Sequence, residues 1–327
     1  MIRTATPADL PALRALFARA NDEPYDLAAV AEEKCFAEGV AGGPVVRFAG
    51  EGQGAVVTCG KYVRILVVDR DSRQRGIGTA LLADAEARGA RVIAAEPGNY
   101  FTPGISNQST QAFFRSRGYE EKAATWNLSV NLLDVPGLRV FETSSRPGVE
   151  SSGRRVVESS SRRGVVSATE AVVPLEDLKT RRLEDSTGRL EDSTGTPRIH
   201  RPSNAEAPRV LAFIEREFGR IWRFEAAKAF DTEVPQIFVA EEEDQVTGFA
   251  AHDVNNRGLG FFGPTGVAKA MRGRGLGCRL LLASLGDLRR LGFERAVIPW
   301  TDALAFYRKC SGAEPAHPFI AFEKPQP

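Results

Sequence analysis

Two glycine-rich turns in this sequence have the composition of phosphate-binding loops. One follows the apolar run that ends at Val267 and consists of Arg272, Gly273, Arg274, Gly275, Leu276 and Gly277. The other follows the apolar run that ends at Val68 and contains Arg73, Gly76 and Gly78. Each turn opens an amphipathic segment whose first backbone N–H groups have no partner within the helix, and such groups bind anions. Glycine also lets a pyrophosphate approach the backbone closely, so each turn predicts a pyrophosphate site.

The spacing of the glycines separates these turns from two better-known phosphate loops. A dinucleotide fingerprint needs a third glycine where Cys278 stands, and the ATP-type Gly-Lys-Ser/Thr sequence does not occur. The pattern Arg/Gln-x-x-Gly-x-Gly/Ala resembles the pyrophosphate loop of the GNAT acetyltransferase superfamily. That resemblance implies acetyl-CoA as the acyl donor, with its pantetheine arm between two strands that a bulge splays apart. Pro264 and Gly266 interrupt the strand before the second loop, where such a bulge is expected.

The same order of elements occurs twice along the chain, which predicts two tandem domains. Residues 1–139 and 198–327 each show strand, two helices, three strands, helix, strand, helix and strand. The resemblance implies that each is an α/β (α+β) GNAT-like domain with a mixed, mostly antiparallel sheet and helices on both faces. Residues 140–197 are rich in Ser, Arg, Glu, Gly and Thr, and RLEDSTG at 182–188 is repeated at 189–195. We expect this segment to be a disordered linker.

The sequence also predicts the bounds of several elements in the two domains. The second helix of the first domain is expected at 26–38 and the helix after its long Pro/Gly connection near 109–117. The closing strands are expected around 126–130 in the first domain and near 319–322 in the second. A hairpin turn at 255–258 should join two strands of the second domain.

Composition limits the kinds of partner. The chain has 43 basic and 42 acidic residues, so it lacks the positive excess of a nucleic-acid-binding protein. It has no run near the roughly 18 apolar residues of a membrane span and no apolar signal core at its start, so we expect a cytoplasmic protein. Its four cysteines form no Cys-x-x-Cys pair, so neither a disulfide framework nor a metal site is indicated. The sequence leaves the oligomeric state open.

Acetyl transfer from a thioester needs groups that remove a proton from the attacking amine and protonate the leaving thiolate. The resemblance implies that Tyr307, on the helix after the fifth strand of the second domain, is the general acid. Phe114 stands at the equivalent position of the first domain and cannot donate a proton. Asn107 matches the family's cofactor-holding asparagine, whereas the second domain has Trp300 there. We therefore expect the second domain to be catalytic. For the first domain three alternatives stay open: a degenerate domain that binds acyl-CoA unproductively, one that acts on another amine through Tyr100, or one that only supplies an interface.

The general base and the acceptor pocket are less defined. The strand 259–267 contains no carboxylate, so Asp253 and His252 on the adjoining strand are the candidate bases; since they alternate about the sheet, at most one should face the acceptor. Trp222, Arg223 and Trp300 are the candidate acceptor-binding residues, because flat rings with polar neighbours suit a sugar or another polar small molecule.

These residues predict an acetyl-CoA-dependent N-acetyltransferase that acts on the primary amine of a small molecule. A glucosamine-type sugar is the first candidate acceptor, and amino acids, aminoglycosides, polyamines and the amine precursors of mycothiol-type thiols stay open. The rival from another class is a catalytically silent acyl-CoA-binding or scaffold protein. Phe114, Trp300 and the absent strand carboxylate favour that rival, whereas Tyr307 and the intact second loop oppose it.

Overall fold

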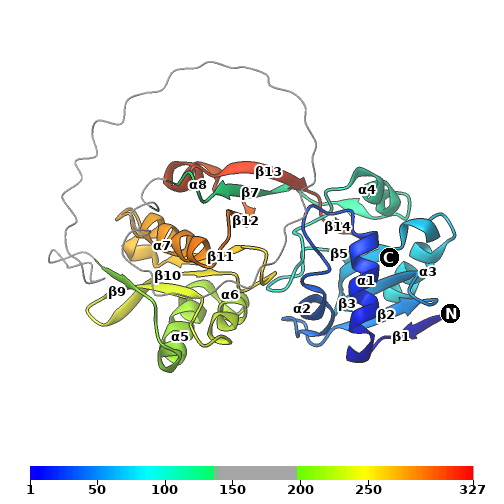
Figure 1. The fold of residues 1–327 in the computed structure, drawn as a ribbon, viewed down its shortest axis with the longest axis horizontal. Helices are drawn as coiled ribbons and strands as arrows, with labels where there is room; N and C mark the ends of the chain where they lie inside the picture. The colour runs from blue at the N-terminus through cyan, green and yellow to red at the C-terminus, as the bar shows by residue number, and fades with distance from the viewer. Residues whose placement is uncertain (136–137, 139–196, 327) are drawn as a thin grey trace, which may run out of the picture. The chain divides into compact units, whose positions relative to one another are not determined.

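A computed structural model describes residues 1–135, 138 and 197–326. The predicted linker falls almost wholly outside these residues. The described residues of both halves belong to one compact unit, and the element order of the first half is repeated in the second (Figure 1). The structure is a mixed α/β fold with two similar halves, as the sequence predicted.

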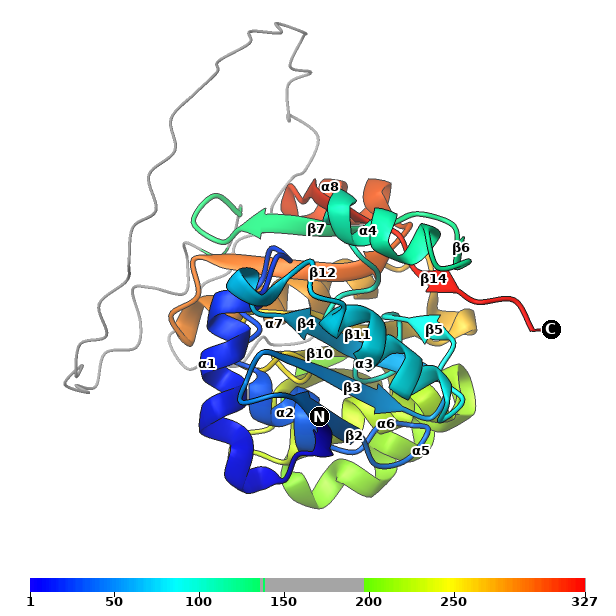
Figure 2. The same cartoon turned by 90° about the vertical axis from the view of Figure 1, so that its right-hand side faces the viewer.

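The N-terminal half alternates short helices with strands, and all of its strands except the last belong to one sheet (Figure 2). Its helices are η1 (Pro7–Asp9), α1 (Leu10–Ala20), α2 (Ala31–Phe36), η2 (Arg70–Ser72), α3 (Ile77–Glu86) and α4 (Gln108–Arg115). Its strands are β1 (Ile2–Thr4), β2 (Val45–Ala49), β3 (Gly54–Cys59), β4 (Tyr62–Val68), β5 (Val92–Ile93), β6 (Glu120–Glu121) and β7 (Thr125–Asn131).

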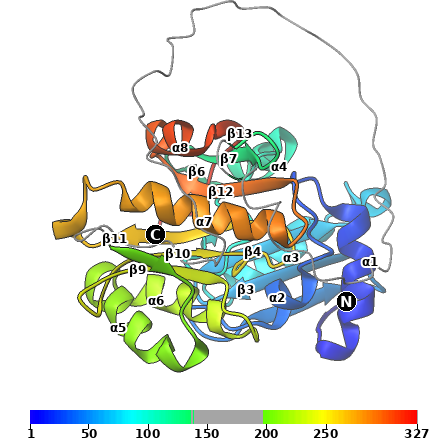
Figure 3. The same cartoon turned by 60° about the vertical axis from the view of Figure 1, so that its left-hand side comes forward.

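The C-terminal half repeats this order with longer helices (Figure 3). Its helices are η4 (Asn204–Glu206), α5 (Ala207–Phe218), α6 (Arg220–Ala227), η5 (Lys228–Phe230), η6 (Lys269–Met271), α7 (Leu276–Arg290) and α8 (Leu304–Ser311). Its strands are β8 (Arg198–His200), β9 (Ile237–Glu242), β10 (Gln245–His252), β11 (Phe262–Val267), β12 (Arg295–Thr301), β13 (Glu314–Phe319) and β14 (Phe322–Glu323).

The two halves exchange one strand each. The first sheet has the order β1-β2-β3-β4-β5-β14-β6, so β14, from the end of the chain, lies between two strands of the N-terminal half. Reciprocally, β7 lies between β12 and β13 of the C-terminal half (Figure 1). Strands β8 to β11 form the other part of that sheet, and an isolated parallel bridge between Phe261 and Val297 connects the two parts. The predicted closing strands therefore exist, but β14 pairs with strands of the N-terminal half and β7 pairs with strands of the C-terminal half.

Both sheets carry a bulge on the strand before the glycine-rich loop, and the bulge on β11 includes Pro264, where one was predicted. On β4 the register shifts between Val57 and Thr58 of its partner strand, so Arg64 is the additional residue. On β11 the register shifts between Ala250 and His252 of its partner, where Gly263 and Pro264 are inserted. The only parallel pairing within the first sheet, β4 with β5, covers just Tyr62–Val92 and Val63–Ile93. Beyond these pairs the two strands diverge, which leaves a gap in the sheet.

Apolar side chains cover both faces of each sheet. In the N-terminal half, α1 and α2 pack Leu13, Leu16 and Phe17 on one face, while α3 and α4 pack Leu81 and Phe114 on the other. In the C-terminal half, α5 and α6 cover one face and α7 and α8 the other, and Figure 3 shows α7 running across β10 and β11. Helices on both faces of each sheet were predicted from the resemblance.

Two predicted elements differ in detail. The helix expected at 26–38 begins only at Ala31, because the Asp26 carboxylate accepts hydrogen bonds from the backbone N–H groups of Ala28 and Ala29 and holds residues 26–29 in a turn. In the second half, β13 covers Glu314–Phe319, although the sequence predicted a closing strand only near 319–322. The hairpin between β10 and β11 is confirmed by their antiparallel pairing.

Candidate active sites in the two halves

The two glycine-rich loops have the same backbone geometry. Gly76 caps α3 with a φ of 80°, and Gly275 caps α7 with a φ of 75°, in the left-handed region that favours glycine. Each loop arginine donates from Nε to the carbonyl of the last strand residue, Arg73 to Val68 (3.1 Å) and Arg272 to Val267 (3.2 Å). A Cβ added to Gly76 or to Gly275 would meet nothing within 4 Å. Both loops therefore leave room for a phosphate over the glycine, beside the free N–H groups of a helix.

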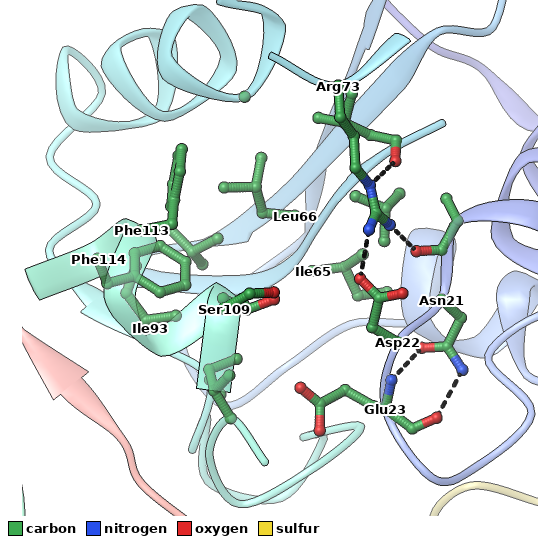
Figure 4. A pocket seen from close by; sticks show the side chains of 18 of the residues that line it. Asn21, Asp22, Glu23, Ile65, Leu66, Arg73, Ile93, Ser109, Phe113 and Phe114 are labelled. Carbon is green, nitrogen blue, oxygen red and sulfur yellow. Dashed lines mark hydrogen bonds and ion pairs between the residues drawn. The ribbon is translucent and has the colours of Figure 1, made fainter. Parts of the chain in front are cut away.

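A cavity of about 420 Å³ lies in the gap between β4 and β5 of the N-terminal half. Its lining joins residues of both strands, the loop that begins at Arg73, the first turn of α3, the helix α4 and the segment 20–23 (Figure 4). Val68, Arg73, Gly76 and Gly78, four of the residues predicted to bind the cofactor, are among the lining residues. The volume is within the range of ~300–1,000 Å³ typical of small-molecule sites.

Two of the cationic side chains that line this cavity are held in ion pairs. The Arg73 guanidinium lies 2.9 Å from Asp22 Oδ2 and also donates to the Ala20 carbonyl, so it fastens the phosphate loop to the end of α1. Arg64, the bulge residue, makes a bidentate pair with Glu96 at 2.6 and 2.8 Å. Arg64 therefore stabilises β4 beside the gap.

Two other charged groups of the lining have different surroundings. Glu23 accepts hydrogen bonds from the Ser106 backbone N–H (3.0 Å) and hydroxyl (2.6 Å), and burial raises the pKa of its carboxyl above the usual value. Arg117 donates to Thr79 Oγ1 (2.6 Å) in the first turn of α3, and its Nε is buried with no hydrogen-bond partner among the residues that the structure describes. The sequence analysis predicted neither residue, because a single charged residue in a connection carries no pattern.

Aromatic side chains lie over the corresponding strand and loop of the C-terminal half. The Phe218 ring lies over β11, where a Cβ added to Gly266 would be only 2.5 Å from it, and it stacks on Trp222 with the ring centroids 5.2 Å apart. At the loop the two halves are alike, because Phe306 lies 3.3 Å from the position of a Cβ on Gly277 and Phe113 lies 3.5 Å from that of a Cβ on Gly78. The remaining loop side chains face other elements: Arg274 pairs with Glu242 on β9, and Leu276 is buried.

Tyr307 lies at the position that corresponds to Phe114. Its side chain is 8% exposed, its ring contacts Phe262 and Phe306 edge-on, and burial raises the pKa of its hydroxyl to about 12. The hydroxyl therefore keeps its proton at neutral pH, as a general acid must. Phe114 is buried against Tyr119 and Phe322 and forms part of the cavity wall (Figure 4). The role of Tyr307 as acid stays a prediction.

The two candidate bases are both buried. His252 Nε2 lies 2.7 Å from Asp287 Oδ2, and burial lowers the pKa of the imidazole. Asp253 accepts hydrogen bonds from the N–H groups of Gly258 (2.8 Å) and Gly260 (3.3 Å) in the β10–β11 turn, and burial raises its pKa to about 6. These bonds give both residues a structural role, and their part in catalysis stays a prediction.

The candidate acceptor residues lie at the surface of the C-terminal half, and Asn107 lies at a helix end. Trp222 and Trp300 are partly exposed, and Trp300 contacts the Tyr100 ring of the N-terminal half edge-on. Arg223 pairs with Glu215 at 3.1 Å. Asn107 caps α4 by accepting a hydrogen bond from the Thr110 N–H. None of these four lines the N-terminal cavity.

Within residues 1–135, 138 and 197–326, no three His, Cys, Asp or Glu side chains gather as a metal site would require. Over the same ranges, no helix has the length and apolar character needed to cross a bilayer.

A mixed sheet with a bulged fourth strand and a glycine-rich anion loop, present twice, defines a tandem acyltransferase. Residues 205–312 match the sequence model of the Acetyltransferase (GNAT) family, and residues 26–121 match that of the Acetyltransferase (GNAT) domain. The chain therefore belongs to the GNAT family of N-acetyltransferases, whose acyl donor is acetyl-CoA. No curated protein matches the sequence.

Solved structures share the fold at low sequence identity. A glucosamine N-acetyltransferase region of a fungal β-N-acetylglucosaminidase aligns with a TM-score of 0.67 and 16% identity over 98% of this chain; the alignment spans only 38% of the fungal protein. A GCN5-related N-acetyltransferase from Sphaerobacter thermophilus aligns with a TM-score of 0.60 and 17% identity, over 99% of this chain and 95% of its own. A tandem GNAT protein from the clavulanic acid biosynthesis pathway aligns with a TM-score of 0.59 and 14% identity, over 100% and 99%.

Proposed function

We propose that the protein transfers an acetyl group from acetyl-CoA to the primary amine of a small molecule, and that acetyl-CoA binds in the cavity of the N-terminal half. The observation that carries this proposal is the cavity between β4 and β5, which opens onto the loop 73–79. Its position matches the expected course of the donor, with the pyrophosphate at the loop and the pantetheine arm between the splayed strands. The N-terminal half is then the binding half, contrary to our expectation from sequence.

The residues of the loop support this assignment. The N–H groups of the first turn of α3 and the open space over Gly76 suit a pyrophosphate, and Arg117 adds a positive charge beside that turn. Ile65, Leu66 and Ile93 give the cavity apolar walls where the pantetheine arm would pass. Bound acetyl-CoA would supply the thioester, and the protein would orient it and exclude water.

A glucosamine-type amine is the first acceptor to test. The fungal region with a TM-score of 0.67 is described as a glucosamine N-acetyltransferase, but its 16% identity carries only the fold. The exposed rings of Trp222 and Trp300 supply flat surfaces suited to a sugar. Amino acids, aminoglycosides, polyamines and thiol-precursor amines belong in the same panel.

One matched pair of substitutions tests which half binds the donor. An acidic residue in the first turn of a helix favours the helix dipole but repels a phosphate bound there. We expect Gly78→Glu to weaken acetyl-CoA binding by about 100-fold, roughly 2.7 kcal/mol, and Gly277→Glu to change it less than about threefold. Isothermal titration with acetyl-CoA gives both values without knowledge of the acceptor. The reverse ranking would move the donor site to the C-terminal half.

A second candidate places the reaction in the C-terminal half, with Tyr307 as general acid. The retained proton of Tyr307 and the intact geometry of the loop 272–277 favour it. A thiol-release assay with the amine panel tests both candidates at once. Donor binding without turnover of any amine would instead support a silent acyl-CoA-binding protein.

A further inference from the structure

The charged side chains that line the cavity can be divided by whether they have a partner of opposite charge. Five charged residues line it: Asp22, Glu23, Arg64, Arg73 and Arg117. Asp22 and Arg73 neutralise each other, and Arg64 is neutralised by Glu96. Glu23 and Arg117 form no ion pair within the described part of the chain. One negative and one positive charge are therefore left for ligands.

These two charges belong to different parts of the cavity wall. Arg117 is bonded to Thr79 at the start of α3, which is the phosphate end. Glu23 lies on the segment between α1 and α2, and its carboxylate accepts a hydrogen bond from Ser106, which lies just before α4. Figure 4 shows the Asp22 carboxylate turned to Arg73, and the Glu23 carboxylate turned away from it. The positive charge suits the donor's phosphates, so the negative charge is available to the acceptor.

The surroundings of Glu23 suit a group that exchanges a proton. Burial raises the pKa of its carboxyl, and hydrogen bonds from Ser106 and the N-terminal end of α4 oppose that rise. The neighbouring charge of Asp22 raises it further, and Tyr25 is the other titratable group close by. Arg64 and Arg73, which also line the cavity, are paired with Glu96 and Asp22. Neither arginine therefore forms an ion pair with Glu23 that would lower the pKa of its carboxyl.

We propose that Glu23 binds the ammonium group of the acceptor and acts as the general base of the acetyl transfer, so that the acceptors are primary amines that are protonated in solution. This inference rests on the proposed function of the N-terminal cavity. Glu23 lies outside the strands on which a base was expected from the sequence.

The proton inventory of the step balances with one carboxylate. Glu23 takes the first proton from the ammonium, which leaves a neutral amine with a lone pair. The amine nitrogen forms a bond to the acetyl carbon as the carbon–sulfur bond breaks. The departing thiolate takes the second proton from nitrogen, and the third stays on the amide. Glu23 then releases its proton to water, so the products are the N-acetylated amine, free CoA and one proton.

Substitution of Glu23 in the full-length protein tests this role. With the amine that the wild-type protein acetylates best, we expect Glu23→Gln to lower kcat by about 100-fold, within the usual range for loss of a general base, and to keep acetyl-CoA affinity within about twofold. The wild-type rate should fall as the pH drops through the pKa of Glu23, and the variant should lack this acidic limb. Glu23→Asp, which keeps the carboxylate, should restore part of the rate.

Two further variants separate catalysis from a merely structural bridge. Ser106→Ala removes one hydrogen bond from the Glu23 carboxylate and should shift the acidic limb to higher pH. Asp22→Asn removes the negative charge that raises the pKa of the Glu23 carboxyl, so it should keep the acidic limb but move it to lower pH. These two responses would not arise if Glu23 only joined two segments of the fold.

The outcomes distinguish the inference from the function on which it rests. If Glu23→Gln keeps the wild-type rate and pH profile, Glu23 is not the base, although the N-terminal site stands. If Glu23→Gln is unstable, a Ser106→Ala profile that coincides with the wild type would overturn the inference. If the wild-type protein binds acetyl-CoA but acetylates no amine in the panel, both the proposed function and the role of Glu23 fail.

Discussion

The connection between the first two helices is the region where the two halves differ most. In the N-terminal half it spans residues 21–30 and brings Asp22 and Glu23 to the cavity. In the C-terminal half it is the single residue Gly219, with a φ of 91°, and the Phe218–Trp222 stack follows from it. The same sheet and the same loop therefore border an open, charged cavity in one half and an aromatic cluster in the other. A fold repeated within one chain can keep the donor loop while the acceptor side diverges.

A second difference lies where α4 and α8 end. Arg117 reaches Thr79 at the phosphate loop of the N-terminal half. In the C-terminal half these two positions are Cys310 and Cys278, which lie against each other, and burial raises the pKa of Cys310 to about 12. A guanidinium and a hydroxyl can bind a phosphate, whereas two cysteine side chains are weak hydrogen-bond donors and bring no positive charge. Both differences favour the proposal that the donor binds in the N-terminal half.

Substitutions in the two exchanged strands should have the largest effects on stability and should affect acetyl-CoA binding differently in the two halves. Phe322 on β14 is fully buried in the N-terminal core, and Leu128 on β7 is buried in the C-terminal core. We expect Phe322→Ala to destabilise the protein by about 3–5 kcal/mol and Leu128→Ala by about 2–5 kcal/mol. Only Phe322→Ala should also weaken acetyl-CoA binding, because Phe322 packs on Phe114 and Ile93 of the cavity wall. Urea unfolding and titration calorimetry measure the two effects.

A loss of acetyl-CoA binding in Leu128→Ala alone would contradict that assignment. If both variants lose binding equally, the two halves do not unfold separately.

The β10–β11 turn distinguishes the halves by its response to pH. Asp253 has a pKa of about 6 against an ordinary 3.8, whereas the N-terminal hairpin turns at Gly60 and Lys61 without an acid. A carboxyl with a raised pKa stabilises the fold below its unfolded pKa, and this contribution is lost as the pH rises through 6. Asp253→Asn keeps an oxygen acceptor for Gly258, so it should be more stable than the wild type by about 2 kcal/mol at pH 7.5 and equal to it near pH 3.

Thermal unfolding of the two proteins between pH 3 and pH 8 checks this expectation. A constant difference across the range would mean that Asp253 does not titrate as a buried group. Loss of acetyl transfer in the same variant would restore Asp253 as a catalytic base.

The phosphate end of the cavity should give a smaller effect on binding. Arg117→Gln removes a cation from the first turn of α3, and we expect about a tenfold weaker affinity for acetyl-CoA, roughly 1.4 kcal/mol. Cys310→Ser is the matched control at the equivalent place in the C-terminal half and should leave the affinity unchanged. Calorimetry at low and high salt measures both, and a wild-type affinity in Arg117→Gln would place the phosphates elsewhere.

The smallest expected effect concerns Tyr307. If the reaction takes place in the N-terminal half, Tyr307→Phe should change kcat by less than about twofold, because the ring keeps its packing. A thiol-release assay measures the rate. A fall of about 100-fold, as is usual for a general acid, would instead confirm the prediction made from the sequence and place the chemistry in the C-terminal half.

The loops were predictable because their geometry is local. A left-handed glycine at the start of a helix and an arginine bonded to the end of a strand depend on a few neighbouring residues, so Arg73 and Gly76 could be read directly. The exchange of β7 and β14 was not predictable, because either strand satisfies the same position in either sheet. The cavity depends on the segment 21–30 and on packing across the sheet, neither of which has a periodic pattern. Residue matching alone therefore favoured the half with Tyr307.

The position of β14 also sets an order of events during synthesis. Phe322 pairs with Ile93, which leaves the ribosome roughly 230 residues earlier. At ~5–20 residues per second, β5 waits about 10–50 s for its neighbour and meanwhile presents an unpaired edge to the cell. A nascent N-terminal half is therefore a client for chaperones until the last strand arrives, and premature termination anywhere in the second half would leave it permanently unfinished.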